Sequence, residues 1–325
     1  CALGLAVPAA QIVAAGALMR RGILVKDGSA LERLAEADRA LFDKTGTLTL
    51  GRPEPVSLSM LGPKQKSLAL ALARASRHPL SESLRRALER DGVAAAAITQ
   101  IREEAGIGIS AMFGRQAIAL RRPDNGVPED CLATMLAIEG EPPTTILFSD
   151  PIRPDAEDTI RALARLKLPA TILSGDRAEA VAPVARKLGL TAQTSMLPQD
   201  KLDTIARLSA SGAKVLMIGD GLNDGPALAA GHVSMAPGSA SDAGQNAADA
   251  IFLGDSIAPV ATAIRVARAT QGIVRQNFVL AIGYNAIAVP LAILGLVTPL
   301  IAALAMSGSS LVVVANALRL RSLAK

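Results

Sequence analysis

Short apolar runs that end in polar residues recur along the chain. Three of them lie before acidic or hydroxyl residues: Ala40–Phe42 before Asp43, Ala170–Leu173 before Ser174, and Lys214–Ile218 before Gly219-Asp220. Stretches of helical periodicity separate these runs, and strands that alternate with helices form parallel sheets whose carboxyl edge binds ligands. The pattern therefore predicts an α/β unit, completed by strands at His232–Met235 and Ala250–Leu253.

A different pattern interrupts this alternation between about Val56 and Pro143. Lys66–Ala75 and Ser81–Arg90 have the period of helices, and three later segments alternate like antiparallel strands: Ile98–Glu103, Ile109–Phe113 and Gln116–Arg121. We therefore expect an inserted α+β module. The α/β pattern then returns with a strand at Thr145–Ser149.

Two stretches carry no charged residue, Cys1–Met19 and Asn277–Leu318. The first is barely long enough for one membrane span, and composition alone fits a buried core helix equally well. The second could cross a bilayer core of ~30 Å about twice, with Thr298-Pro299 marking the break between the spans. Basic residues lie before and after it but not in its turn, which places both ends in the cytoplasm: Arg275, Arg319, Arg321 and Lys325.

The composition supports membrane segments and argues against two other classes. Hydrophobic residues make up 50% of the 325 residues and the mean hydropathy is +0.35, too apolar for an ordinary soluble enzyme. The net charge is +5, but without Trp, with one Tyr and without a long basic run, nucleic-acid binding is disfavoured. The two cysteines, Cys1 and Cys131, indicate neither a disulfide framework nor a zinc pair.

The run Asp43-Lys44-Thr45-Gly46-Thr47-Leu48-Thr49 carries the strongest chemical signal. A carboxylate at the end of a buried strand can hold Mg²⁺ or attack phosphorus as a nucleophile. A phosphatase of this kind usually carries a second Asp two residues on as a general acid, where this chain has Thr45. The sequence therefore predicts a site that forms an aspartyl phosphate at Asp43 and keeps it.

The other polar strand ends suit the same chemistry, because phosphoryl transfer needs positioning and charge neutralisation. Asp220, together with Asp43 and the carbonyl of Thr45, can form an oxygen site for Mg²⁺. Lys201 and the hydroxyls of Ser174 and Thr45 can hold the transferred phosphate.

Two further residues after the third strand, Asn223 and Asp224, can orient metal and water. Capping of the helix that follows is a simpler alternative for Asp224, and also for Asp176.

The seven residues from Asp43 to Thr49 resemble the phosphorylation motif of P-type ion-transporting ATPases at every position. This resemblance implies a haloacid dehalogenase-like phosphorylation domain with the catalytic residues Asp43, Lys201, Asp220 and Asp224. It also implies an inserted nucleotide-binding domain, in which His78-Pro79 and Gly106-Ile107-Gly108 resemble the ATP-binding residues of heavy-metal pumps. Taken singly, His78 fits a helix cap and the glycines fit a turn. The resemblance implies further contacts to ATP phosphate and cofactor: Lys44, Thr45, Ser174, Gly175, Asp176 and Asn223.

The charge-free segments resemble the membrane helices of the copper(I)-transporting subgroup. The run from Cys1 to Pro8 resembles the second half of a Cys-Pro-Cys helix. Four residues then resemble the metal site of that subgroup, although composition alone favours helix packing: Tyr284, Asn285, Met306 and Ser310. Soft sulfur ligands from Cys1 and Met306 suit Cu⁺. Zinc and cadmium pumps would be expected to carry an Asp in the last span, and this chain has none.

We therefore expect the C-terminal part of a Cu⁺-transporting P-type ATPase, without the actuator domain and earlier spans. The expected parts are a partial transmembrane helix (1–19), a linker and the first part of the phosphorylation domain (20–52), the nucleotide-binding domain (53–144), the second part of the phosphorylation domain (145–258) and two transmembrane helices (272–318). ATP, Mg²⁺, membrane lipid and a metallochaperone are the expected partners, in a bacterial inner membrane with cytoplasmic catalytic domains. The alternatives are a stand-alone phosphatase of the same fold and a pump for Zn²⁺ or Cd²⁺.

Overall fold

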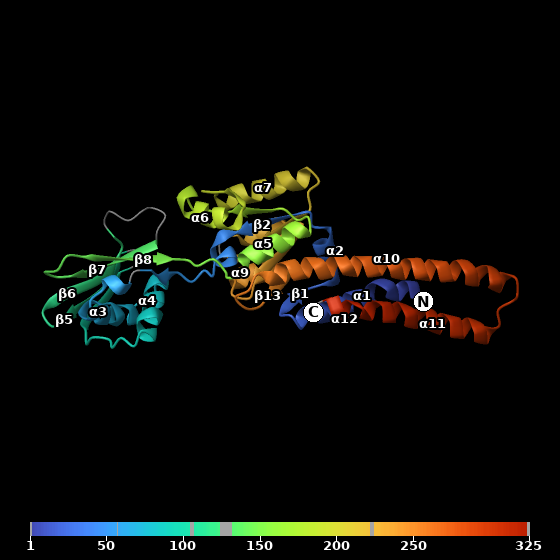
Figure 1. Cartoon of the computed structure of the whole chain (residues 1–325), viewed down its shortest axis with the longest axis horizontal. Coiled ribbons are helices and arrows are strands. Elements are labelled where there is room, and N and C mark those ends of the chain that lie inside the picture. Colours follow the sequence, from blue (N-terminus) through green and yellow to red (C-terminus); the bar gives the residue numbers. More distant parts are fainter. Residues whose placement is uncertain (1, 57, 105–106, 124–131, 222–223, 324–325) are drawn as a thin grey trace. The chain divides into compact units, whose positions relative to one another are not determined.

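The computed structural model describes residues 2–56, 58–104, 107–123, 132–221 and 224–323 (Figure 1). The chain divides into two compact units. One comprises residues 1–48, 153–175 and 185–325, and the other comprises residues 49–152 and 176–184.

The first unit is built on a sheet in which, among the described residues, seven strands lie in the order β1-β13-β12-β11-β2-β9-β10. All neighbouring pairs are parallel except β1 with β13. Their bounds are β1 Ile23–Val25, β2 Arg39–Asp43, β9 Ala170–Leu173, β10 Thr191–Gln193, β11 Val215–Ile218, β12 Val233–Pro237 and β13 Ala250–Phe252. The parallel sheet predicted from the alternating pattern is confirmed. Strands β1 and β10 were not expected, because three residues are too few to show a period.

Helices cover this sheet in two groups, each held together by contacts among its members. Helices α2 (Gly28–Glu36) and α5 (Ala156–Arg165) contact α10 (Ala258–Ile293). Helices α7 (Pro198–Ala210), α8 (Gly225–Ala230) and α9 (Asp242–Ala247) form the other group, and α6 (Ala178–Leu188) follows β9. Leu41, Val215 and Met217 of the central strands are buried in one cluster with Ile205 of α7. Such continuously apolar central strands are typical of a sheet covered on both faces.

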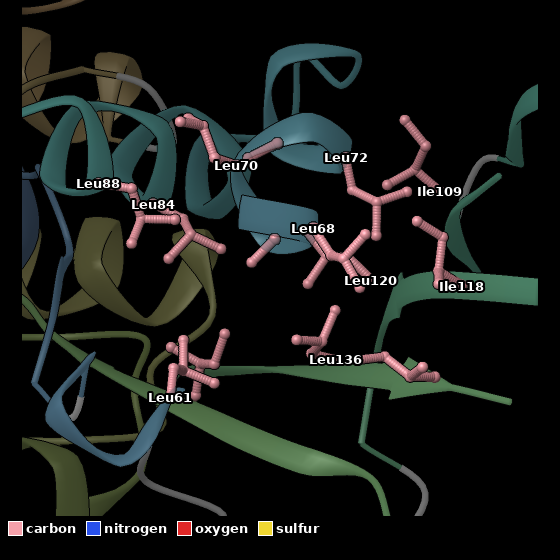
Figure 2. Close-up of a cluster of buried hydrophobic side chains, with 14 of the residues drawn as sticks. Leu61, Leu68, Leu70, Leu72, Leu84, Leu88, Ile109, Ile118, Leu120 and Leu136 are labelled. Carbon is pink, nitrogen blue, oxygen red and sulfur yellow. The ribbon is translucent and has the colours of Figure 1, made fainter. Parts of the chain in front are cut away.

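The second unit contains an antiparallel sheet in the order β3-β8-β7-β6-β5-β4 and the helices α3 (Pro63–Arg74) and α4 (Pro79–Arg90). Its strands are β3 Glu54–Pro55, β4 Thr99–Glu104, β5 Gly108–Phe113, β6 Gln116–Arg121, β7 Leu132–Ile138 and β8 Thr144–Ser149. The core lies between the helices and one face of the sheet, where leucines of α3 and α4 meet Ile109, Ile118, Leu120 and Leu136 (Figure 2).

The strand expected at Thr145–Ser149 forms, but it belongs to this second sheet. It is β8, and it pairs antiparallel with β7 on one side and with β3 on the other. The sequence pattern predicts it as part of the returning α/β alternation, because that pattern does not predict β7. The run Leu132–Ile138 (LATMLAI) lacks strict alternation and contains helix-forming residues, so its pattern does not predict a strand.

Three apolar helices pack together in the first unit, with α1 (Ala2–Met19) against both α10 and α11 (Pro299–Leu318) (Figure 1). Within the described residues, α10 and α11 are long and apolar enough to cross a membrane. The break predicted at Thr298-Pro299 is present, and the Thr298 hydroxyl caps α11 by accepting from the N–H of Ile301 at 3.3 Å. However, α10 begins at Ala258, well before residue 272, where the span was expected to begin. The helix then continues without a break for 36 residues.

Candidate active site

Three adjacent strands bring polar residues to one edge of the parallel sheet. Strand β2 lies between β9 and β11 and ends at Asp43, which is paired in register with Leu173 of β9. Ser174 follows β9 directly, and Asp220 lies two residues after β11 ends. The central position of β2 therefore places Asp43 between the two neighbouring strand ends.

A buried ion pair network joins Asp43, Lys201 and Asp224. The Lys201 ammonium group donates to Oδ1 of Asp43 at 2.8 Å and to both carboxylate oxygens of Asp224 at 2.7 and 2.9 Å. Lys201 lies in the first turn of α7, and Asp224 occupies the N-cap position of α8 without making a capping bond there. The capping alternative for Asp224 therefore does not describe its side chain, which bonds Lys201 instead.

The pKa of Asp43 is raised to about 7, mainly because the carboxyl group is buried. The positive charge of Lys201 lowers this pKa, whereas the nearby carboxylate of Asp224 raises it further. Burial alone would lower the pKa of Lys201, but the carboxylates of Asp43 and Asp224 outweigh it and raise that pKa. Two carboxylates thus share one cation in a buried place, so the site has an excess of negative charge when both are ionised.

The loop after Asp43 turns back through a left-handed glycine. Gly46 has φ +70°, and a Cβ there would lie 2.7 Å from Oδ2 of Asp220, so a side chain would displace that carboxylate. Thr45 is exposed and Lys44 is half-buried. Thr47 was given no role by the sequence analysis, yet its hydroxyl is fully buried and has no hydrogen-bond partner among the described residues. Such an unsatisfied group is consistent with a loop that closes around a ligand.

The backbone carbonyl of Asp220 is held by two residues that the sequence did not indicate. Its carbonyl accepts from the backbone N–H of Ser241 at 3.0 Å, at the start of α9. Gly244 of α9 packs so closely that a Cβ there would lie 2.3 Å from the same carbonyl. The signal in the sequence for this contact is a pair of glycines, Gly221 and Gly244, which allow α9 to approach the backbone of Asp220 closely.

The remaining residues expected at this edge have different placements. Ser174 is buried, and its backbone bonds Gln193 and Met196 on the following segment. Gly175 is exposed, with a hypothetical Cβ 3.2 Å from the carbonyl of Met196. Asp176 is half-buried on the turn before α6. Asn223 lies outside the described residues.

The oxygen groups expected to hold Mg²⁺ fit that ion. Asp43 ends β2 and Asp220 packs against Gly46 of the same loop, with the Thr45 carbonyl in the chain between them. In the described part of the chain, three His, Cys, Asp or Glu side chains do not gather into a metal cluster. Mg²⁺ keeps several waters and is usually held by one or two carboxylates, so this sparse, hard donor set matches it.

In the second unit, His78 caps a helix. It occupies the N-cap position of α4, where its Nδ1 accepts from the N–H of Leu80 at 3.2 Å. This bond requires a neutral imidazole, because Nδ1 acts as the acceptor, and it leaves Nε2–H as a donor on an exposed side chain. Ser76 supports the turn by accepting from the His78 N–H and donating to Glu103 of β4 at 2.6 Å.

Gly108, the second glycine of the expected nucleotide site, begins β5 with φ +142°, and a Cβ there would lie 2.2 Å from the Leu120 carbonyl. Gly106 lies outside the described residues. A cavity of ≈ 490 Å³ lies on the sheet of the same unit, lined by residues of β4 to β7, among them Arg102 and Arg121, and by Glu139 just after β7. Neither His78 nor Gly108 lines this cavity.

The expected metal ligands of the membrane helices are on two helices. Tyr284 and Asn285 are half-buried on α10, and Met306 on α11 is 54% exposed. The hydroxyls of Ser309 and Ser310 both donate to the Met306 carbonyl, at 2.8 and 3.1 Å. In the part of the chain that the structure describes, no hydrogen bond joins the α10 pair to the α11 group. Cys1 lies outside the described residues.

A polar contact that the sequence analysis missed does link the three apolar helices. Asn277 of α10 is fully buried, donates to the Ala6 carbonyl of α1 at 3.4 Å and accepts from Asn316 of α11 at 2.9 Å. A single Asn at the start of a charge-free run gives no pattern, although a polar residue in an apolar bundle usually has a partner.

The family model for haloacid dehalogenase-like hydrolases matches residues 37–232. Among curated proteins, the nitrogen fixation protein FixI of Rhizobium leguminosarum is 47% identical over all of this chain and 44% of its own length. The copper-exporting P-type ATPase of Mycobacterium tuberculosis is 37% identical over 99% of this chain and 44% of its length. The chain thus spans less than half the length of these relatives.

Solved structures give a similar result. A zinc-transporting PIB-type ATPase in its E2·Pi state aligns with a TM-score of 0.83 and 31% identity over 98% of this chain and 56% of that one. A catalytic CPx-ATPase domain, CopB-B, aligns with a TM-score of 0.65 and 29% identity over 77% of this chain and 98% of its own. The match therefore extends over both units and the apolar helices.

Proposed function

The chain belongs to the haloacid dehalogenase-like hydrolases and, within them, to the heavy-metal P-type ATPases, and from that premise we propose that it drives Cu⁺ across a membrane through an aspartyl phosphate on Asp43. Membership of this family supports the use of ATP and Mg²⁺ and the transport of a metal ion. The residue roles, the metal and the transport cycle are our proposal.

The observation that carries the proposal is the buried contact of Lys201 with Asp43 and Asp224. A carboxylate oxygen of Asp43 attacks the γ-phosphorus of ATP, the new O–P bond forms as the bond to the β–γ bridging oxygen breaks, and ADP leaves. Lys201 is held 2.8 Å from the attacking group and offsets the charge that gathers on the phosphoryl oxygens. Mg²⁺, held by Asp43, Asp220 and the Thr45 carbonyl, would supply further charge neutralisation.

The persistence of the phosphoenzyme is attributed to Thr45. It stands where a phosphatase would carry a general acid, and a hydroxyl is a much weaker proton donor than a carboxylic acid. Hydrolysis would then await another group. This feature, together with the two apolar helices, favours a pump over a stand-alone phosphatase.

Nucleotide binding is assigned to the second unit. The neutral imidazole of His78 offers Nε2–H to a base ring, and Gly108 permits close approach of the backbone. Lys44, Gly175, Asp176 and Asn223 are proposed to contact phosphate or its cofactor.

Copper is proposed from the chemistry of the membrane residues. Thioether and thiolate sulfur, from Met306 and Cys1, select a soft monovalent ion, and Tyr284, Asn285 and Ser310 would complete the site. No Asp or Glu lies between residues 277 and 318 to attract Zn²⁺. The similarity to a zinc-transporting ATPase keeps Zn²⁺ as the second candidate. A metallochaperone as metal donor and the bacterial inner membrane, with catalytic units in the cytoplasm, complete the proposal.

The chain, solubilised with lipid and Mg²⁺, should incorporate phosphate from γ-labelled ATP in an acid-stable, hydroxylamine-sensitive form. Asp43→Asn should abolish this label, because an amide cannot attack phosphorus. Asp203→Asn is a matched control, since Asp203 is exposed on the same helix as Lys201 and its carboxylate accepts a hydrogen bond from Gln199. Label that persists in Asp43→Asn refutes the assignment.

A further inference from the structure

Arg153, which the proposed reaction does not use, holds the phosphorylation loop. Its side chain is 2% exposed, and its guanidinium donates through Nε to the Thr47 carbonyl at 2.7 Å and through a terminal nitrogen to the Gly46 carbonyl at 2.8 Å. Its backbone N–H also donates to the Leu48 carbonyl at 2.9 Å. Three consecutive loop carbonyls are therefore fixed by one residue, and a planar guanidinium holds two of them in a set geometry.

Two residues further on, Asp155 caps a helix other than its own. It occupies the N-cap position of α5 without bonding α5 through its side chain. Its carboxylate instead accepts from the N–H groups of Ile257 and Ala258, at 2.9 and 2.8 Å, and from the Ser256 hydroxyl at 2.6 Å. These groups lie at the start of α10, in its first residue and the two residues before it, and the N-cap residue Ile257 supplies no side-chain bond.

The other end of α5 is bonded to α10 as well. Arg268 of α10 donates to the carbonyl of Leu166, the C-cap residue of α5. Its second terminal nitrogen donates at 2.9 Å to the carbonyl of Ala37, the C-cap residue of α2, which lies two residues before β2. Helix α5 is therefore tied to α10 at both ends, and α10 is tied to the strand that carries Asp43.

We propose that the segment Arg153–Asp155 and helix α5 couple the phosphorylation loop to the membrane helix α10, with Arg153, Asp155 and Arg268 as positioning residues. A change in the loop carbonyls on phosphorylation moves Arg153. Because Asp155 is only two residues further along the chain, this movement displaces the carboxylate that caps α10. The inference rests on the proposed function, because it takes Asp43 as the group whose state changes.

Hydrogen exchange of the whole chain in detergent micelles tests this coupling, with Mg²⁺ and beryllium fluoride as the mimic of phosphate on Asp43. In the wild type, beryllium fluoride should alter exchange both in 43–49 and in the first turns of α10, 258–270. In Asp155→Asn the change in 43–49 should remain and the change in α10 should be lost. Labelling from ATP should stay within about threefold of wild type, because Asp155 contacts neither the nucleophile nor Lys201.

Asp158→Asn is the matched control, since it removes the same charge from the first turn of α5, where Asp158 is exposed and pairs with Arg161. Arg268→Lys at the opposite end of α5 gives an independent variant should Asp155→Asn misfold, and it should also lose the α10 response. An unchanged α10 response in a folded Asp155→Asn or Arg268→Lys variant overturns the coupling. If Asp43 of the wild type takes up no label, the proposed function and the coupling both fail. If Asp43 is labelled but the α10 response is unchanged in the variants, the coupling alone fails.

Discussion

At the scale of single residues, the site depends on an imbalance of buried charge. Lys201 faces two carboxylates at hydrogen-bond distance, so the metal-free site holds one negative charge more than it can pair when both are ionised. Burying an uncompensated charge costs several kcal/mol unless it is protonated or bound to a cation. The raised pKa of Asp43 reports this cost, and Mg²⁺ would remove it.

This imbalance predicts a pH-dependent stability without metal. An unfolded Asp titrates near 3.8, whereas the folded-state pKa of Asp43 is about 7, so the folded state keeps a proton that the unfolded state has released. The free energy of unfolding should therefore fall as the pH rises from about 4 to about 7. In Asp43→Asn this fall should be absent, and at pH 8 in EDTA the variant should exceed wild type by roughly 1–3 kcal/mol.

Chemical denaturation of both proteins at several pH values, with and without Mg²⁺, measures this effect. Added Mg²⁺ should stabilise the wild type and leave Asp43→Asn almost unchanged. A wild type that is more stable than the variant at pH 8 in EDTA would contradict the electrostatic account.

Lys201 should contribute strongly to the rate of the proposed reaction. Lys201→Gln should lower the rate of phosphoenzyme formation by about 10²–10³, since a lost charge-stabilising donor costs about 3–4 kcal/mol in other enzymes. Rapid-quench labelling with γ-labelled ATP measures this rate. Lys214→Gln is the control, because Lys214 is exposed on the same unit. Equal rates in the two variants would argue against a phosphate role for Lys201.

At the scale of elements, the sequence predicted those helices and strands that have a clear periodicity or a polar residue at a strand end. The central strands were predictable because each of β2, β9 and β11 is an apolar run with a polar residue at its end or within two residues after it. The partner of β8 was not predictable, since pairing across a sheet depends on β7, whose sequence has no strand-like alternation. Likewise, the contacts of Arg153 and Asp155 join segments about 100 residues apart, and no local pattern encodes them.

Strand β5 gives a prediction at this scale. Gly108→Ala would place a Cβ 2.2 Å from the Leu120 carbonyl of β6, so the hairpin must shift. We expect a loss of at least roughly 2 kcal/mol of stability in the second unit and weaker binding of a fluorescent ATP analogue.

Gly114→Ala in the β5–β6 turn is the matched control. Gly114 also has a positive φ, of 61°, but a Cβ there meets nothing within 4 Å. It should therefore cost only the ~1 kcal/mol of a left-handed residue. Equal losses in the two variants would show that the clash at Gly108 is not the cause.

At the scale of the whole molecule, two asparagines on α10 should have separable roles. Asn277 bridges α1 and α11 by hydrogen bonds, whereas Asn285 is half-buried and is a proposed metal ligand. Asn277→Ala should weaken helix packing by about 0.5–1.7 kcal/mol, the range for hydrogen bonds in membrane proteins, with little effect on metal affinity. Asn285→Ala should do the reverse.

Unfolding in mixed micelles measures the packing, and titration with Cu⁺ and with Zn²⁺ under reducing conditions measures the affinity. Met306→Ala should weaken Cu⁺ binding and leave Zn²⁺ binding almost unchanged, because a thioether is a soft ligand. Tighter binding of Zn²⁺ than of Cu⁺ by the wild type would favour the second candidate metal.

The unbroken course of α10 has a consequence for the size of motion that chemistry at Asp43 can produce. A helix of 36 residues is about 54 Å long, so a tilt of only about 5° at its capped start sweeps its far end through roughly 5 Å. That distance is close to the pitch of one helical turn. Under the proposed function, a helix of this length would act as a lever that amplifies small displacements around a phosphate on Asp43 into larger ones at its far end.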